Sequence, residues 1–186
     1  MSAKKTKELE DIKEQIIKET GIRVIKSSRI SYNPDKNKSK NKDYIAKGGF
    51  GAIYHCRIKG EKKERGPFVV KVIAFNNDLL SIKPILNEIA LHRVCSANKY
   101  VIELISVAIR FNDVDTSVLD INPDTGTEDK KLDYLVQMVM PFCQTSLEQY
   151  CMDNYSRGDE LSFRLDLIFY QVLLGLEYIH KKGIIH

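Results

Sequence analysis

Residues 44–71 run Tyr44-Ile-Ala-Lys-Gly-Gly-Phe-Gly-Ala-Ile-Tyr54, then a charged turn, and then Phe68-Val-Val-Lys71. Apolar residues precede the glycines and alternate with polar ones after them, which is typical of a turn closed by strands on both sides. No helix is expected directly after this turn. P-loops and dinucleotide-binding loops both deliver their glycines into a helix N-terminus, so the pattern excludes those two phosphate sites. It predicts a flap between two strands, with backbone N–H groups that lie over phosphate groups.

This stretch resembles the glycine-rich loop and strand lysine of eukaryotic-type protein kinases. The family's three glycines followed by valine correspond to Ala46-Lys-Gly-Gly-Phe-Gly-Ala-Ile53, with Ala46 in place of the first glycine. The family's Val-Ala-Ile-Lys corresponds to Phe68-Val-Val-Lys71. The resemblance implies that Lys71 and the loop bind the phosphates of ATP, the loop residues being Ala46, Lys47, Gly48, Gly49, Phe50 and Gly51. Because a β-branched side chain would block the approach of the phosphates, we expect Gly51→Val to weaken ATP binding far more than the fold.

A carboxylate partner for Lys71 is expected on the next helix. Apolar residues recur at helical spacing over residues 79–94, which predicts a helix with one buried stripe. Glu88 stands where kinases place the carboxylate that holds the strand lysine charged and aimed at the α- and β-phosphates. We therefore expect Lys71 and Glu88 to be the catalytic ion pair. Four residues later the family usually has an apolar residue, whereas this chain has His92, either a pH-responsive group or a structural residue with satisfied hydrogen bonds.

The remaining ATP contacts are implied by a strand expected over residues 132–142, which resembles the fifth kinase strand and the hinge between the two lobes. Open backbone groups at the end of such a strand can bind the edge of adenine as another strand would. By resemblance, Ser146 occupies the ribose position, where many relatives have a carboxylate, so this contact is expected to be weaker. The residues implied to line the apolar slot, close its back, supply the hinge backbone or contact the ribose are Ile53, Val69, Met140, Phe142, Cys143 and Ser146.

The expected fold class is α+β, in three regions. Residues 1–43 form an N-terminal helix, with Gly21 as its stop, and a basic flexible linker. Residues 44–142 form a kinase-like small lobe with a five-stranded antiparallel sheet and one regulatory helix. Residues 143–186 form the hinge and the first two helices of the large lobe, which begin at the capping box Thr145-Ser-Leu-Glu148 and near Ser162. Leu9, Ile12, Ile16 and Ile17 recur at helical spacing, so the N-terminal helix is expected to dock through this stripe, either on its own domain or on a partner.

Composition limits the partners and the compartment. The net charge of +4 is too small to imply nucleic-acid binding, and the +6 on residues 1–47 is expected to keep this arm soluble. The four cysteines lack metal-ligand spacing and the N-terminus lacks an apolar signal region, which favours a reducing, cytoplasmic setting. No apolar run is long enough to suggest a membrane span.

The resemblance implies transfer of the γ-phosphate of ATP to a protein hydroxyl, of serine or threonine, with Mg²⁺. The sequence stops at His186, which resembles the histidine of the kinase His-Arg-Asp triplet. The catalytic aspartate and the Mg²⁺ ligands would lie beyond this residue, so we expect these 186 residues alone to be inactive. Three interpretations stay open: part of an active kinase, a pseudokinase-like module that binds nucleotide or a partner, and an interaction domain that binds no nucleotide.

Overall fold

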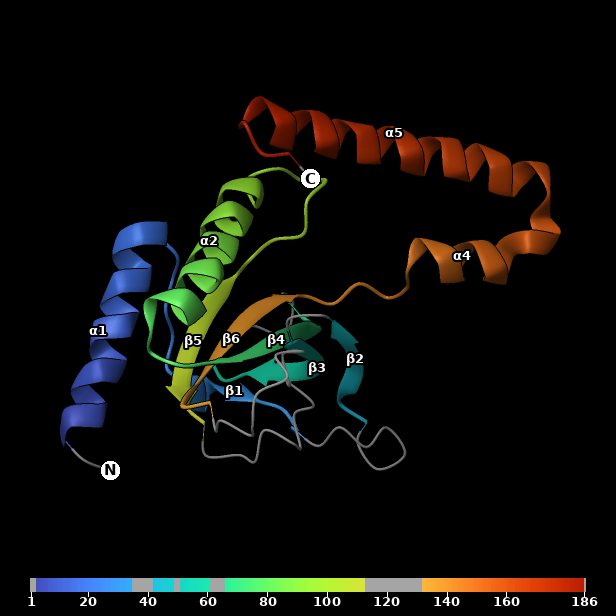
Figure 1. Cartoon of the computed structure of the whole chain (residues 1–186). Coiled ribbons are helices and arrows are strands. Elements are labelled where there is room, and N and C mark those ends of the chain that lie inside the picture. Colours follow the sequence, from blue (N-terminus) through green and yellow to red (C-terminus); the bar gives the residue numbers. More distant parts are fainter. Residues whose placement is uncertain (1–2, 35–41, 49–50, 61–65, 113–131, 186) are drawn as a thin grey trace.

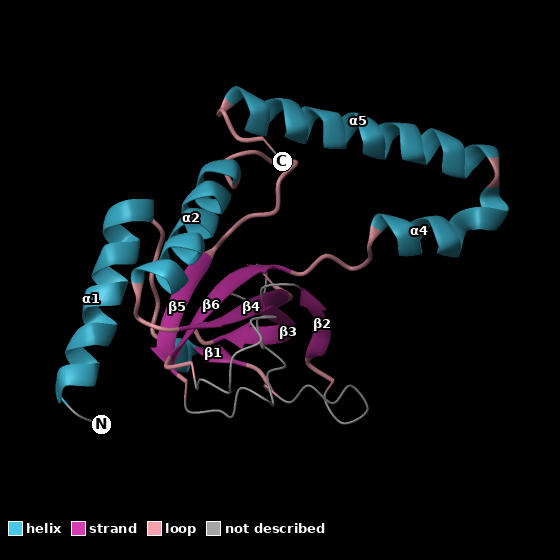
Figure 2. Cartoon of the chain, in the orientation of Figure 1, coloured by secondary structure: helices cyan, strands magenta, loops and turns pink. Residues whose placement is uncertain are grey.

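A computed structural model describes residues 3–34, 42–48, 51–60, 66–112 and 132–185. One curled antiparallel sheet forms the centre of the molecule, and two helices, α1 (Ala3–Thr20) and α2 (Leu79–Cys95), lie side by side on one of its faces (Figure 1). The chain leaves the sheet through an extended segment and continues into helices α4 (Leu147–Asn154) and α5 (Asp159–Lys181) (Figure 2). The α+β fold class predicted from the sequence is confirmed.

The sheet has the strand order β1-β3-β4-β6-β5. The remaining strand, β2, also pairs with β3 but lies outside this order. Every paired strand is antiparallel to its neighbour. The five predicted strands are confirmed, and a short β1 adds a sixth. Their bounds are Ile30–Ser31 (β1), Tyr44–Gly48 (β2), Gly51–Ile58 (β3), Phe68–Phe75 (β4), Ser106–Phe111 (β5) and Tyr134–Pro141 (β6).

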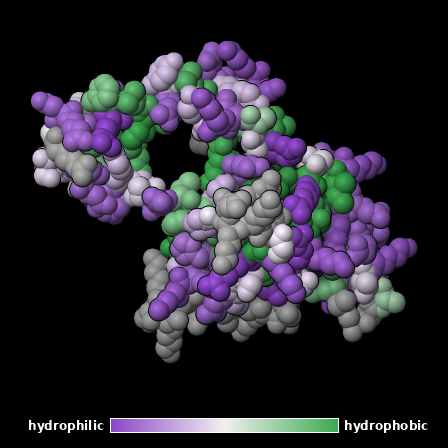
Figure 3. Space-filling model, turned by 180° about the vertical axis from the view of Figure 1, so that it is seen from behind, coloured by the Kyte–Doolittle hydropathy of each residue, from purple (hydrophilic) through white to green (hydrophobic). Residues whose placement is uncertain are grey.

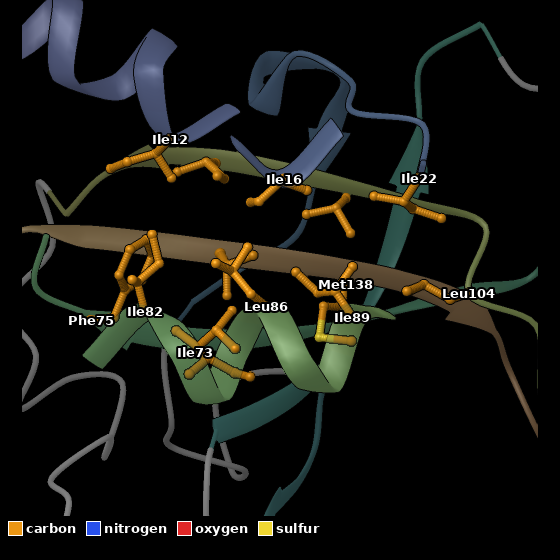
Figure 4. Close-up of a cluster of buried hydrophobic side chains, with 14 of the residues drawn as sticks. Ile12, Ile16, Ile22, Ile73, Phe75, Ile82, Leu86, Ile89, Leu104 and Met138 are labelled. Atoms are coloured by element: carbon orange, nitrogen blue, oxygen red, sulfur yellow. The ribbon is translucent and has the colours of Figure 1, made fainter. Parts of the chain in front are cut away.

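Alternation along the strands sorts the apolar side chains into two clusters, one on each face of the sheet. In β4, Val69, Ile73 and Phe75 belong to the cluster that α1 and α2 cover (Figure 4). Phe68, Val70 and Val72 belong to the cluster on the opposite face, which also contains Ile25 and Ile30 of the N-terminal segment. Lys71 lies two residues from both Val69 and Ile73 along β4, so it is on the same face of the sheet, the face that carries α2.

Local signals explain how the covering helices begin and end. The Asp78 carboxylate accepts a hydrogen bond of 2.8 Å from the Ser81 amide and caps the N-terminus of α2. Gly21 has φ +62° and donates its amide to the Ile17 carbonyl at 2.9 Å, which ends α1 as predicted. On the buried stripe of α1, Ile12 and Ile16 are buried, but Ile17 is half exposed, so its predicted burial is wrong.

Helices α4 and α5 form an arm with little of the described protein packed against it. The side chain of Ser146, not Thr145, caps α4 by accepting a hydrogen bond of 3.1 Å from the Gln149 amide, which corrects the predicted capping residue. α5 begins three residues earlier than expected and exposes large apolar side chains, namely Phe163, Leu167, Phe169, Tyr170, Val172 and Leu173. Figure 3 shows hydrophobic residues beside an opening in the molecule. Among the described helices, none is long and apolar enough to cross a membrane.

Candidate functional site

A lysine and a glutamate from different elements meet beside the core. Lys71, in the middle of β4, donates its ammonium to the Glu88 carboxylate of α2, with a separation of 2.5 Å between Nζ and Oε1. The side chains of Lys71 and Glu88 keep 21% and 35% of their surface exposed. Both side chains of the pair are therefore partly buried, and each keeps enough exposed surface to contact a charged ligand. A lysine held in this way has one fixed direction for its remaining N–H donors.

The sheet register surrounds Lys71 with apolar side chains on the same face. Ile53 of β3 lies opposite Lys71, and Val69 lies opposite Met140 of β6. Val69 and Met140 are buried and Ile53 is partly buried, all within or against the cluster that α2 covers. Three predicted lining residues from three strands therefore come together next to the ion pair.

One neighbour of Lys71 was missed from the sequence. Met138 of β6 lies opposite Lys71 and is buried in the same cluster. Side chains two residues apart on a strand share a face, so the position of Met140 already carried this signal. Lys71 therefore has the apolar side chain of Met138 beside it on the neighbouring strand.

The glycine turn lies between strands, as the sequence predicted. β2 and β3 pair up to Gly48 and Gly51, which lie opposite each other, and Gly49 and Phe50 fall outside the described residues. Ala46 lies opposite Ile53, directly after an irregularity in the β2 register, and Lys47 is exposed at its place opposite Ala52. The turn of this hairpin therefore lies two residues before Ile53, the β3 residue that lies opposite Lys71.

Gly51 has a structural task that the sequence did not reveal. A Cβ atom built on Gly51 would clash with the carbonyl oxygen of Val72 and would lie 3.0 Å from the side chain of Ile73. Glycine is therefore needed for the close approach of β3 and β4, whatever the loop binds. Gly51→Val is therefore expected to weaken the fold as well as ATP binding, a cost that the sequence alone did not indicate.

Backbone groups at the end of β6 form an open strand edge. The Ile105 amide donates to the Val139 carbonyl at 2.9 Å on the β5 side, and the Phe142 amide donates to the Pro67 carbonyl at 3.0 Å on the β4 side. Because backbone groups alternate between the two sides of a strand, the Pro141 carbonyl faces the β5 side, beyond the end of β5. Cys143, whose amide is a potential donor, is exposed just after the strand. An acceptor and a donor two residues apart are the groups that a flat heterocycle can pair with.

Two further residues singled out in the sequence have defined partners. Ser146 Oγ accepts the capping hydrogen bond of α4, which leaves its hydroxyl proton for another acceptor. His92 Nε2 lies 2.9 Å from the carbonyl oxygen of Ile102 and ties the last turn of α2 to the segment before β5. His92 is thus a hydrogen-bonded structural residue in this structure.

The buried Cys56 thiol is not a nucleophile of this site. Burial, followed by the charge of Asp43, raises the pKa of the Cys56 thiol to about 12, so this cysteine on the far face of the sheet stays protonated. Within the described ranges, no group of three or more His, Cys, Asp or Glu residues could hold a metal ion. The chemistry of this site therefore depends on the lysine and glutamate pair, the open strand edge and the glycine hairpin.

Comparison with known proteins agrees with this arrangement. The model of the protein kinase domain family matches residues 39–186, which is most of the chain. The match begins before β2 and includes the hairpin, the Lys71–Glu88 pair, the open edge after β6 and both helices of the arm. A comparison with curated proteins finds no match. On the strength of the family match and of the fold, this chain belongs to the protein kinase domain family.

Proposed function

We propose that this chain binds ATP on the α2-covered face of the sheet, as the nucleotide-binding part of a protein kinase that phosphorylates serine or threonine. The observation that carries the proposal is the Lys71–Glu88 ion pair, 2.5 Å long, beside a cluster of apolar side chains. In a kinase this lysine contacts the α- and β-phosphates and the glutamate holds it in place.

The apolar side chains beside the pair would contact the base of the nucleotide. Ile53 and Val69 would contact one face of adenine, and Met140 would close the back of the pocket. The open edge offers the Pro141 carbonyl to an exocyclic amine and the Cys143 amide to a ring nitrogen. Phe142 uses its own amide for the β4 ladder and places its ring 4.5 Å from that of His55, so it would support the edge.

The other end of the nucleotide would lie under the hairpin. Residues 46–51 would place backbone N–H groups over the phosphates, and Ser146 Oγ would contact the ribose by donating its proton. Mg²⁺ would come with the ATP phosphates.

Finer parts of the proposal come from the resemblance. The phosphate acceptor is a serine or threonine hydroxyl of a protein, and the 186 residues alone are expected to bind nucleotide without transferring phosphate. A cytoplasmic location fits the four cysteines, which are all free thiols in the structure.

The test is the affinity for ATP, measured by titration calorimetry, of the chain and of Lys71→Met. Methionine keeps the apolar stem and removes the charge, so we expect affinity to fall roughly 10- to 150-fold, the range for a hydrogen bond to a charged group. Lys83→Met is the matched control, since Lys83 is exposed on α2 and should keep wild-type affinity. Equal affinity of Lys71→Met and wild type contradicts the site.

A second measurement separates catalysis from binding alone. In the full-length protein, transfer of labelled γ-phosphate to serine, threonine and tyrosine peptides is measured with and without Lys71→Met. Lysine-dependent transfer to serine or threonine supports the kinase. ATP binding without transfer supports the pseudokinase-like alternative, and the absence of ATP binding supports an interaction domain.

A further inference from the structure

Helix α1, which lies outside the nucleotide slot, packs directly against the helix that carries Glu88. α1 contacts α2 and β5, and the two helices lie side by side (Figure 1). Ile12 and Ile16 of α1 are only 2% and 1% exposed. Both belong to the cluster that contains the buried stripe of α2, namely Ile82, Ile85, Leu86 and Ile89 (Figure 4). The apolar stripe of α2 is therefore enclosed by the sheet and by α1 together.

Both ends of α1 are attached to the sheet. Near its start, the Glu8 carboxylate accepts a hydrogen bond of 2.9 Å from the hydroxyl of Tyr134, a buried residue of β6. After its end, the chain pairs with β5 at Val107, which donates to the Arg23 carbonyl at 3.0 Å and accepts from the Ile25 amide at 2.8 Å. Because α1 is attached to the sheet at both ends, its apolar side chains are held at a fixed place against α2.

Hydrogen bonds are found at both ends of α2. The Asp78 cap is local to the helix, whereas at the other end His92 Nε2 lies 2.9 Å from the Ile102 carbonyl oxygen and the Tyr178 hydroxyl donates to the Val94 carbonyl at 3.4 Å. Between them, α2 is positioned by side-chain packing and by the bond of Glu88 to Lys71. Because protein interiors are close-packed, the volume of Ile12 and Ile16 limits how far α2 can move away from β4.

We propose that α1 is a positioning element of the site, in which Ile12 and Ile16 hold α2 where Glu88 reaches Lys71. The inference rests on the proposed ATP site for its functional meaning. Loss of α1 from α2 lets α2 move, separates Glu88 from Lys71 and releases the lysine from its fixed direction. Docking of the N-terminal helix thus sets the fraction of molecules that are competent to bind phosphate through Lys71.

The first experiment measures the ion pair itself, without nucleotide. A water-soluble carbodiimide joins a lysine amine to a glutamate carboxylate only when the two are in contact, and the Lys71–Glu88 cross-linked peptide is quantified by mass spectrometry. We expect its yield to fall severalfold in Ile12→Ala and in Ile16→Ala. Ile16→Val, which removes one methyl group, should keep most of the yield and shows whether a folded variant responds in proportion.

Matched controls come from the opposite face of the sheet. Ile25 and Ile30 are also buried isoleucines of the N-terminal segment, but they belong to the cluster that does not include α2. Ile25→Ala and Ile30→Ala should lower thermal stability and leave the cross-link yield unchanged. An unchanged yield in Ile12→Ala and Ile16→Ala, or an equal loss in the control variants, overturns the positioning role.

The second experiment joins α1 to ATP affinity through a double-mutant cycle. Ile12→Ala should weaken ATP binding in the wild-type background and have little further effect in the Glu88→Gln background, because the interaction that α1 supports is already lost. Equal weakening in both backgrounds contradicts the proposal. If the wild-type chain binds no ATP, the proposed function fails, and the cross-link yields still decide whether α1 positions α2.

Discussion

Replacing Gly51 tests whether this glycine serves the β3–β4 contact or the loop. The structure shows no room for a side chain at this position: a Cβ atom would clash with the backbone carbonyl of Val72 and lie 3.2 Å from its carbonyl carbon. The obstacle is strand backbone, which cannot rotate aside as a flexible side chain can. Gly51→Ala should therefore force β3 and β4 apart locally.

The expected magnitude follows from overpacking. Inserting a methyl group into a close-packed region costs roughly 1–3 kcal/mol, and the lower entropy of the unfolded alanine chain offsets about 0.4–1 kcal/mol of this. For a protein of this size, 1 kcal/mol corresponds to about 2–4 °C in Tm. We expect Gly51→Ala to lower Tm by several degrees and Gly51→Asn, with its larger side chain, to lower it further.

Gly21 is the matched control, because its backbone conformation favours glycine and the space around it does not. Its φ is +62° and a Cβ atom there would meet nothing within 4 Å. Asparagine tolerates this left-handed conformation better than alanine, so Gly21→Asn should be more stable than Gly21→Ala. The order of the two substitutions is then opposite at Gly51 and Gly21. Thermal unfolding followed by circular dichroism measures all four variants, and a Gly51→Ala protein as stable as wild type refutes the packing argument.

Two other predictions concern the alkaline limit of stability and the exposed face of α5. Burial, then the hydrogen bond to Glu8, raises the pKa of Tyr134 from 10.0 to about 12; the stabilisation is complete below pH 10 and is lost as pH rises through 12. Tyr134→Phe should therefore lose stability less steeply across that window in denaturant titrations, and parallel slopes would contradict the assignment. The 186-residue chain should self-associate through α5, and Phe169→Ser with Leu173→Ser should shift it to monomer in light scattering; a monomeric wild-type chain contradicts this.

Much of the sheet and the identity of the central ion pair could be predicted from the sequence. The alternation in Phe68-Val-Val-Lys71 already places Val69 and Lys71 on one face, because neighbouring side chains on a strand point in opposite directions. The sequence pattern predicts a strand over Tyr100 to Phe111, but β5 starts at Ser106, because hydrogen bonds of the Tyr100 and Val101 amides to Asn98 form a turn before it. Such a local side-chain bond competes with strand pairing and is hard to foresee from apolar spacing.

The sequence alone determined which residues could carry the chemistry, since lysine, glutamate and closely spaced glycines are recognisable by type and by local spacing. Only the tertiary structure decided which of them meet. Three contacts join segments that are far apart in the chain. Val69 lies opposite Met140, the Phe142 amide donates to the Pro67 carbonyl, and α1 packs against α2. Such contacts depend on register and packing between elements, and the periodicity of one element carries no information about the register of its partner.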